Sequence, residues 1–121
     1  MKTFISISAL FLSLTLTAQT NTANWYYNDS GQNGIQSPSN TASGSVSVAM
    51  GLSTTASGNF STAMGRDTQA SGDNSTAMGS NTEASGDYST AMGDNTEASG
   101  DYSTAMGYLT KAIGNYSTAM G

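Results

Sequence analysis

The chain contains no cysteine and no histidine among its 121 residues. These absences exclude Ser-His-Asp and Cys-His catalytic systems, thiolate chemistry, disulfide bonds and the usual zinc ligands. Basic residues are also scarce, since three Lys and Arg stand against eight Asp and Glu and leave a net charge of −5. A nucleic-acid partner is therefore not expected, because binding a phosphate backbone needs clustered basic side chains.

Large aliphatic side chains are few, whereas Ser, Thr, Gly and Ala are abundant, a composition that alone would suit a disordered chain. Two short phrases nevertheless recur every 14 residues, and such a fixed period indicates a repeat architecture. The first, Ser-Thr-Ala-Met-Gly, occupies residues 61–65, 75–79, 89–93, 103–107 and 117–121, with a looser copy at 47–51. The second, Thr-x-Ala-Ser-Gly, occupies residues 54–58, 68–72, 82–86 and 96–100, with a drifted copy at 110–114.

Residues 1–18 are typical of a secretory signal peptide. Lys2 supplies the positive start, residues 4–16 are mostly apolar, and the small residues Thr17 and Ala18 follow. The apolar run is shorter than the ~20 residues that a membrane-spanning helix needs. We therefore expect a cleaved signal and an exported protein, located at the cell surface or outer membrane or in the extracellular space.

Residues 19–41 form a polar segment with one aromatic cluster, Trp25-Tyr26-Tyr27. A solenoid needs an atypical unit over its first coil. We interpret the cluster as part of such a cap, and an exposed binding surface is the alternative interpretation. The repeats are expected over residues 42–121.

The unit at residues 88–100 illustrates the expected coil. Its first half alternates in side-chain size, so Ser89 and Ala91 share one face of a strand. Residues 93–95 indicate a turn, and a second short strand is expected at residues 96–99. No stretch has a helical period. The sequence therefore predicts an all-β, parallel β-solenoid with 14 residues and two short strands per coil.

The interior of this solenoid follows from side-chain size. Two sheets joined by such short turns lie close together, so only small side chains fit between them. A charged residue such as Glu97 must then face water. The predicted interior of the roll consists of Ala49, Ala56, Ala63, Ala70, Ala77, Ala84, Ala91, Ala98, Ala105 and Ala112.

The opposite face of the first strand carries large apolar side chains, and a contiguous patch of this kind marks an interaction surface. The interior cannot stabilise the coil alone, since ordering its residues costs about 1–2 kcal/mol each and burying two Ala returns little. We therefore expect an obligate homo-oligomer joined along this face. The predicted interface consists of Met50, Met64, Met78, Met92, Met106, Met120, Phe60, Tyr88, Tyr102 and Tyr116.

The repeat resembles that of a known family. Its form is Asn/Tyr-Ser-Val/Thr-Ala-Ile/Met-Gly, two or three variable residues, then Ser/Thr-x-Ala-x-Gly. Copies lie at residues 60–72, 74–86, 88–100 and 102–114, with a looser copy at 46–58. This pattern is similar to the YadA-like head repeat of trimeric autotransporter adhesins. The resemblance implies a left-handed β-roll, three of which pack about a common axis as a homotrimer, in a surface adhesin. The family's membrane anchor is expected in a region outside this chain.

The sequence gives little indication of a catalytic or metal-binding site. We find no catalytic constellation and expect no enzyme activity, cofactor or metal. Asp73, Asp87 and Asp101 could provide a Ca²⁺ site, but plain solvated turns are the favoured interpretation because Asp suits turn positions. A Cu(I) site on the methionine ladder is disfavoured for a similar reason, because Met commonly fills interfaces.

The expected function is that of an adhesin head that binds host or environmental surfaces, including extracellular matrix, through repeated weak contacts. The binding face is expected on the second strand, at Gln69, Ser71, Glu83, Ser85, Glu97 and Ser99. One alternative is a structural segment of a fibre, such as a phage-tail-like or chaperone-terminated surface protein. A remote alternative is an ice-binding solenoid, suggested by the Thr column at Thr62, Thr76, Thr90, Thr104 and Thr118.

Overall fold

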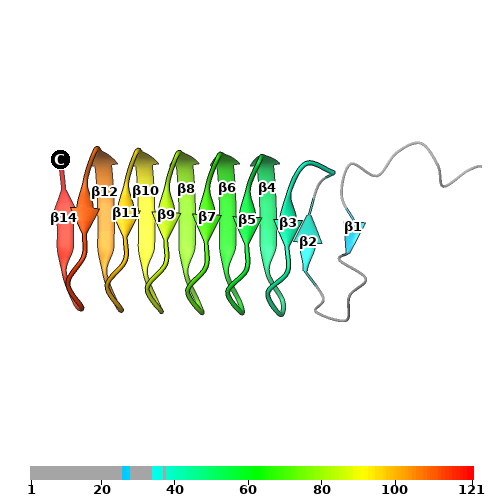
Figure 1. Cartoon of the computed structure of the whole chain (residues 1–121), viewed down its shortest axis with the longest axis horizontal. Helices are drawn as coiled ribbons and strands as arrows, with labels where there is room; N and C mark the ends of the chain where they lie inside the picture. Colours follow the sequence, from blue (N-terminus) through cyan, green and yellow to red (C-terminus); the bar gives the residue numbers. More distant parts are fainter. Residues whose placement is uncertain (1–25, 28–33, 37) are drawn as a thin grey trace, which may run out of the picture.

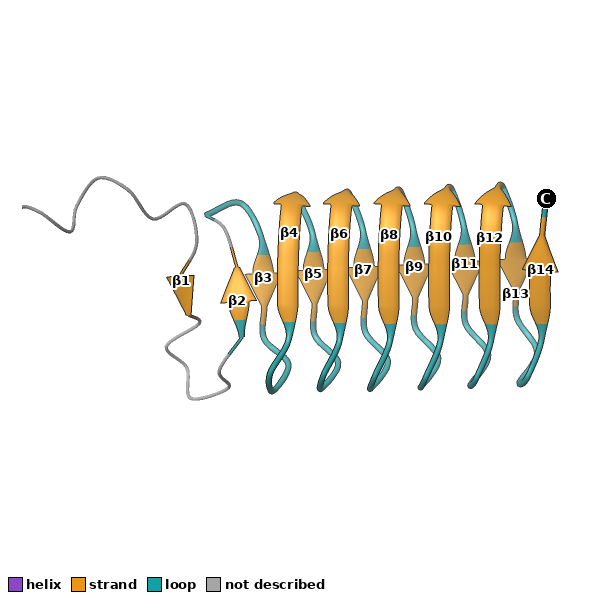
Figure 2. Cartoon of the chain, turned by 180° about the vertical axis from the view of Figure 1, so that it is seen from behind, coloured by secondary structure: helices purple, strands orange, loops and turns teal. Residues whose placement is uncertain are grey.

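The computed structural model describes residues 26–27, 34–36 and 38–121. Within them the chain forms two sheets that face each other along one long axis, and the described part contains no helix (Figures 1 and 2). The first sheet contains β1 (Tyr26–Tyr27), β2 (Ile35–Gln36), β4 (Val48–Leu52), β6 (Thr62–Arg66), β8 (Thr76–Ser80), β10 (Thr90–Asp94), β12 (Thr104–Tyr108) and β14 (Thr118–Met120). The second contains β3 (Thr41–Ala42), β5 (Thr55–Ala56), β7 (Gln69–Ala70), β9 (Glu83–Ala84), β11 (Glu97–Ala98) and β13 (Lys111–Ala112).

Consecutive coils pair in parallel with equivalent residues side by side. Met92 lies opposite Met78 on one side and Met106 on the other, and Ala98 pairs with Ala84 and Ala112 in the second sheet. One chain thus winds through about six turns, about 14 residues apart, alternating a long and a short strand. The predicted all-β parallel solenoid is confirmed. Each sequence position consequently becomes a column of like residues along the axis.

Each coil has two corners, and both are made by residues other than glycine. Positive φ angles recur at every seventh residue from Val46 to Tyr116, for example φ 57° at Tyr88 and 55° at Asn95. From Phe60 onward, the backbone N–H of each corner residue donates to a carbonyl of the preceding coil, as Tyr88 does to Asp73 at 2.8 Å. Because αL geometry costs roughly 1–2 kcal/mol for an L-residue, the stacked coils must hold these corners in place.

The observed positions of the corners differ from those predicted for the coil. Strand β10 continues through Gly93 to Asp94, and the corner lies at Asn95, so the prediction of a turn over residues 93–95 was wrong. Tyr88 occupies the other corner and lies outside the strand on which the sequence placed it. The second strand is also shorter than predicted, because β11 pairs only at Glu97–Ala98.

The space between the sheets is filled by alanine and by hydroxyl side chains. All ten alanines of the predicted interior have 0–2% exposure, and Ala42 joins them. Columns of Ser, such as Ser75 and Ser89, and of Thr, such as Thr82 and Thr96, are buried beside them. The core is therefore thin, and it contains no large side chain within the described residues.

In the first coil the side chain of Asn40 forms hydrogen bonds with the backbone of the following residues. Asn40 lies in the column that Thr occupies elsewhere; its Nδ2 donates to the Gly51 carbonyl, and its Oδ1 accepts from the Thr54 N–H, both at 2.9 Å. Strand β1 pairs antiparallel with β2 and covers the edge of the first sheet. The backbone of Tyr26 and Tyr27 thus occupies the place of the expected cap, whereas Trp25 and the predicted signal peptide lie outside the described residues.

Replacing Gly86 with Ala should destabilise the solenoid by at least about 2 kcal/mol. A Cβ at this position would overlap the carbonyl oxygen of Gly100 in the next coil, and moving that backbone would disturb the ladder. The measurement is the free energy of unfolding in urea.

Gly114→Ala is the matched control, because Gly114 stands in the same column but its Cβ would meet nothing nearer than the Ser117 Cβ at 3.8 Å. We expect its stability to change by less than about 0.5 kcal/mol. Equal losses in the two variants would contradict the close approach of the coils.

Candidate interaction surface

The outer face of the long strands carries a continuous uncharged stripe. Because Ser89 and Ala91 point inward, Thr90 and Met92 point outward, and the same holds in every coil. We call the column of Met50, Met64, Met78, Met92, Met106 and Met120 the methionine stripe. Met106 is 38% exposed and Met120 74% exposed, while the other four are half-buried by their neighbours in the column. A column of one Val and five Thr runs alongside, so neither column carries a charge.

The aromatic residues form a separate column at one corner of the coil. The rings of Tyr88 and Tyr102 stack with centroids 4.8 Å apart and planes 3° apart, and Tyr102 stacks on Tyr116 at 5.2 Å and 8°. Each of these rings is more than half exposed, as is Phe60. The stacked rings therefore form a column that remains largely open to solvent. The predicted interface is thus divided between a strand face and a corner.

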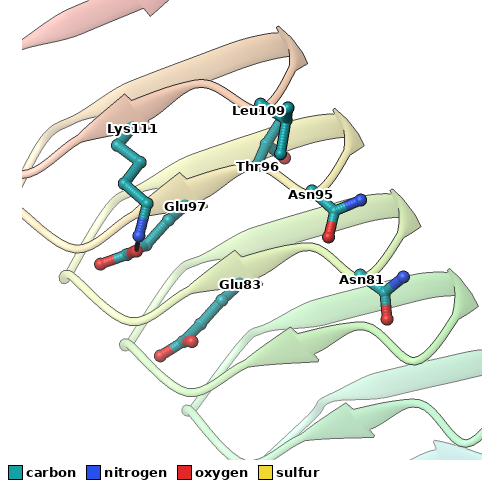
Figure 3. A pocket seen from close by; sticks show the side chains of 7 residues that line it. All are labelled: Asn81, Glu83, Asn95, Thr96, Glu97, Leu109 and Lys111. Carbon is teal, nitrogen blue, oxygen red and sulfur yellow. Dashed lines mark hydrogen bonds and ion pairs between the residues drawn. The ribbon is translucent and has the colours of Figure 1, made fainter.

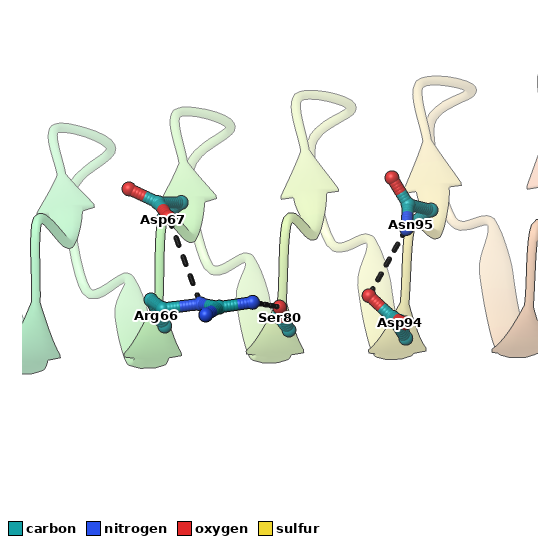
Figure 4. Close-up of polar contacts among 5 residues, drawn as sticks. All are labelled: Arg66, Asp67, Ser80, Asp94 and Asn95. Carbon is teal, nitrogen blue, oxygen red and sulfur yellow. Dashed lines mark hydrogen bonds and ion pairs between the residues drawn. The ribbon is translucent and has the colours of Figure 1, made fainter.

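Polar and charged residues lie at the far ends of the long strands (Figure 4). The Arg66 Nη2 donates to the Ser80 Oγ at 2.9 Å, and its Nε lies 3.8 Å from an Asp67 carboxylate oxygen. One coil further, the Asn95 Nδ2 donates to the Asp94 Oδ1 at 3.0 Å. In these coils the polar groups lie beyond the methionine stripe along the strand, whereas the same column carries the exposed Leu52 and Tyr108 in other coils.

The outer face of the short strands is hydrophilic and shallow. A depression of about 330 Å³ is lined by Asn81, Glu83, Asn95, Thr96, Glu97, Leu109 and Lys111 (Figure 3). In it the Lys111 Nζ donates to the Glu97 Oε2 at 2.6 Å, and the Ser99 Oγ donates to Oε1 at 3.2 Å. The Lys111 ammonium lowers the pKa of Glu97, and Glu97 raises the pKa of Lys111. Of the predicted binding residues, Gln69 and Glu83 are exposed, whereas Ser71, Ser85, Glu97 and Ser99 are partly buried.

The side chains of the acidic turn residues accept hydrogen bonds from the backbone of the preceding coil. The Asp87 Oδ1 accepts the backbone N–H of Asp73 at 2.9 Å, and the Asp101 Oδ1 accepts that of Asp87 at 3.1 Å. Asn59 and Asn115 accept from the preceding coil in the same way. These side chains therefore join adjacent coils, and no group of three or more acidic, His or Cys residues in the described chain is placed to hold a metal ion. The signal for this ladder was present in the sequence as a column of short Asn and Asp side chains, 14 residues apart.

These features define a class of protein. It is a parallel β-solenoid whose outer faces carry extended columns of like side chains. The model of the family described as YadA head domain repeat (2 copies) matches residues 42–68, 70–96 and 98–121, more than half of the chain. The chain belongs to this family, which confirms the resemblance found from the repeat. No curated protein matches the chain, and none of its described residues forms a helix suited to crossing a membrane.

Two replacements of Asp87 should distinguish the contribution of its hydrogen bond to stability from the contribution of its charge. Asp87→Ala removes the acceptor for the Asp73 N–H and should destabilise the protein by about 1 kcal/mol. Asp87→Asn keeps an acceptor and removes one charge from a column of three carboxylates, so it should match or exceed wild-type stability at low salt, with the gain shrinking as salt is added. The measurement is thermal unfolding at two salt concentrations, and an Asn variant as unstable as the Ala variant would contradict the ladder.

Lys111→Met should weaken the acid sensitivity of the protein. Because the folded-state pKa of Glu97 is lowered, its contribution to stability is present above the ordinary value of 4.5 and is lost as pH falls through the lowered value. The raised pKa of Lys111 contributes below its ordinary value of 10.5 and is lost as pH rises. The pair therefore acts between these limits, and weakly, because the lysine side chain is 67% exposed.

The measurement is the urea midpoint at neutral pH and at a pH well below 4.5. Wild type should lose more stability on acidification than Lys111→Met does, and Glu97→Gln should behave like Lys111→Met. Identical acid losses in wild type and both variants would show that the ion pair contributes nothing.

Proposed function

We propose that this chain is the head of an exported, surface-exposed homotrimeric adhesin, with no enzyme activity of its own. The observation that carries the proposal is the methionine stripe, an uncharged outward face that continues without interruption through about six coils. Membership of the YadA head family supports the trimeric adhesin head, and the number three comes from that family. Residues 1–18, proposed to be a cleaved signal, would direct export to the surface.

The energetics of one coil support assembly along the stripe. The interior offers only Ala, Ser and Thr, and hydroxyls such as those of Ser75, Thr82 and Ser89 have no hydrogen-bond partner in the described structure. Such groups add little to stability. Covering a Met side chain contributes roughly 1.5–3 kcal/mol, so burial of the stripe against other chains is the largest gain available per coil.

Surface binding is assigned to the face that stays exposed after this assembly. The short strands point away from the stripe and present Gln69, Glu83 and Glu97 outward in one column. Three chains would repeat this column around the fibre, so weak contacts to host or environmental surfaces would be reinforced by multivalency. Because this face is shallow and polar, it suits repeated contacts with an extended surface better than capture of a small molecule.

Met78→Asp should abolish assembly. In a trimer, three carboxylates would be buried against one another near the common axis, at a cost of several kcal/mol per chain. The measurement is sedimentation equilibrium at micromolar concentration, with circular dichroism to follow folding. Without the partner chains we expect the variant to lose most of its β structure, because one coil cannot offset its own ordering entropy.

Two variants control this experiment. Met78→Leu keeps an apolar side chain of similar volume and should assemble, and Glu83→Ala alters the opposite face and should assemble as well. The adhesion of assembled and unassembled chains to immobilised matrix proteins then tests the binding role. A wild-type protein that is a folded monomer would rule out the trimer, and adhesion equal in Met78→Asp and wild type would rule out multivalent binding.

A further inference from the structure

All the sulfur in the described part of the chain lies in the methionine stripe. The protein has no cysteine and seven methionines, and the one outside the stripe is Met1. In the single chain each stripe side chain is partly exposed, from half-buried in the central coils to 74% exposure at Met120. Six thioethers therefore face solvent together until something covers them.

We propose that the methionine stripe is an oxidation site through which peroxide blocks assembly of the head. In each reaction the sulfur forms a bond to one oxygen atom of hydrogen peroxide as the O–O bond breaks; the thioether is oxidised to a sulfoxide, and the peroxide is reduced to water. This inference rests on the proposed interface, because it concerns the same face. Chains already assembled would be protected, whereas newly exported chains would be sensitive.

The chemistry of the face explains the sensitivity. A thioether is apolar, and its sulfoxide is polar and chiral, a change that disrupts Met-rich interfaces. Met92 lies in register between Met78 and Met106 on neighbouring strands, so a sulfoxide in the middle of the column would stand beside two others. The repeat makes the effect cumulative, since every coil of every chain would bring one sulfoxide to the shared face. The remaining columns are not oxidised by mild peroxide, because they carry no sulfur.

The experiment compares the protein oxidised in the assembled and in the dissociated state. One sample is treated with hydrogen peroxide in buffer and another in urea, and both are then freed of peroxide and refolded. Intact mass counts the added oxygen atoms, peptide mapping locates them, and sedimentation equilibrium measures assembly. We expect Met64, Met78 and Met92 to be protected in buffer and oxidised in urea. Chains oxidised in urea should assemble at least about tenfold more weakly, which corresponds to about 1.4 kcal/mol.

A chain with Leu at all six stripe positions is the matched control. Leu conserves volume and apolarity and cannot form a sulfoxide, so this chain should assemble equally well before and after the same treatment. If the six-Leu chain does not fold, methionine sulfoxide reductases applied to oxidised wild type provide the second control, and assembly should return with the loss of the added oxygen.

The outcomes separate this inference from the proposed function. An untreated wild type that does not assemble would overturn the interface and the oxidation site together. Normal assembly of untreated protein, with fully oxidised chains assembling equally well, would overturn the oxidation site alone. Loss of assembly in the peroxide-treated six-Leu chain, or no recovery after reduction, would also overturn it, because the damage would then lie outside the stripe.

Discussion

Successive coils lie so close together that about one backbone position in seven leaves no space for a side-chain carbon. A Cβ on Gly79 or on Gly86 would overlap the glycine backbone of the next coil, and the same holds along the two columns as far as Gly107 and Gly100. The two sheets are also joined by corners of a few residues, so little room remains between them. Alanine, serine and threonine therefore fill the interior, and large apolar side chains have nowhere to go except outward. The exposed methionine stripe is thus a consequence of how tightly the coil is wound.

Much of this arrangement could be predicted from the sequence, because columns of identical residues leave few alternatives. The 14-residue period, the inward Ala and the outward Met follow from size and alternation alone. The corners could not be predicted in this way. Residues such as Val46, Tyr88 and Leu109 take positive φ at the corners. β-Branched and bulky residues disfavour this conformation, so conformational propensity predicts glycine at such positions. The sequence does contain a signal for the corners. Ala and Gly each recur every seven residues, which divides the 14-residue coil into two halves, and each half ends in one corner.

The corners also explain why a single coil would not be stable. Each αL residue costs free energy that is offset only when its N–H reaches the preceding coil, as that of Asn95 reaches the Ser80 carbonyl at 2.9 Å. The Asp and Asn side chains at the neighbouring turn make a second bond of the same kind between coils. Stability therefore depends on contacts between neighbouring coils along the axis, as in other repeat proteins. Within the described residues the first coil has no complete coil before it, and there the Asn40 side chain provides hydrogen bonds to the Gly51 carbonyl and the Thr54 N–H.

Apart from Asn40 in the first coil, variation between the coils is confined to positions outside this packing. The outward column of the short strands reads Thr55, Gln69, Glu83, Glu97 and Lys111, while the inward Ala one residue later does not change. The corner column likewise changes from Asn74 to Tyr88 without disturbing the hydrogen bond that its N–H makes to the coil before it. Because the winding constrains only what points inward or along the axis, the outer columns are free to carry different chemistry. The outer columns can therefore vary in sequence without disturbing the winding, and they are where the proposed surface binding and the proposed assembly would reside.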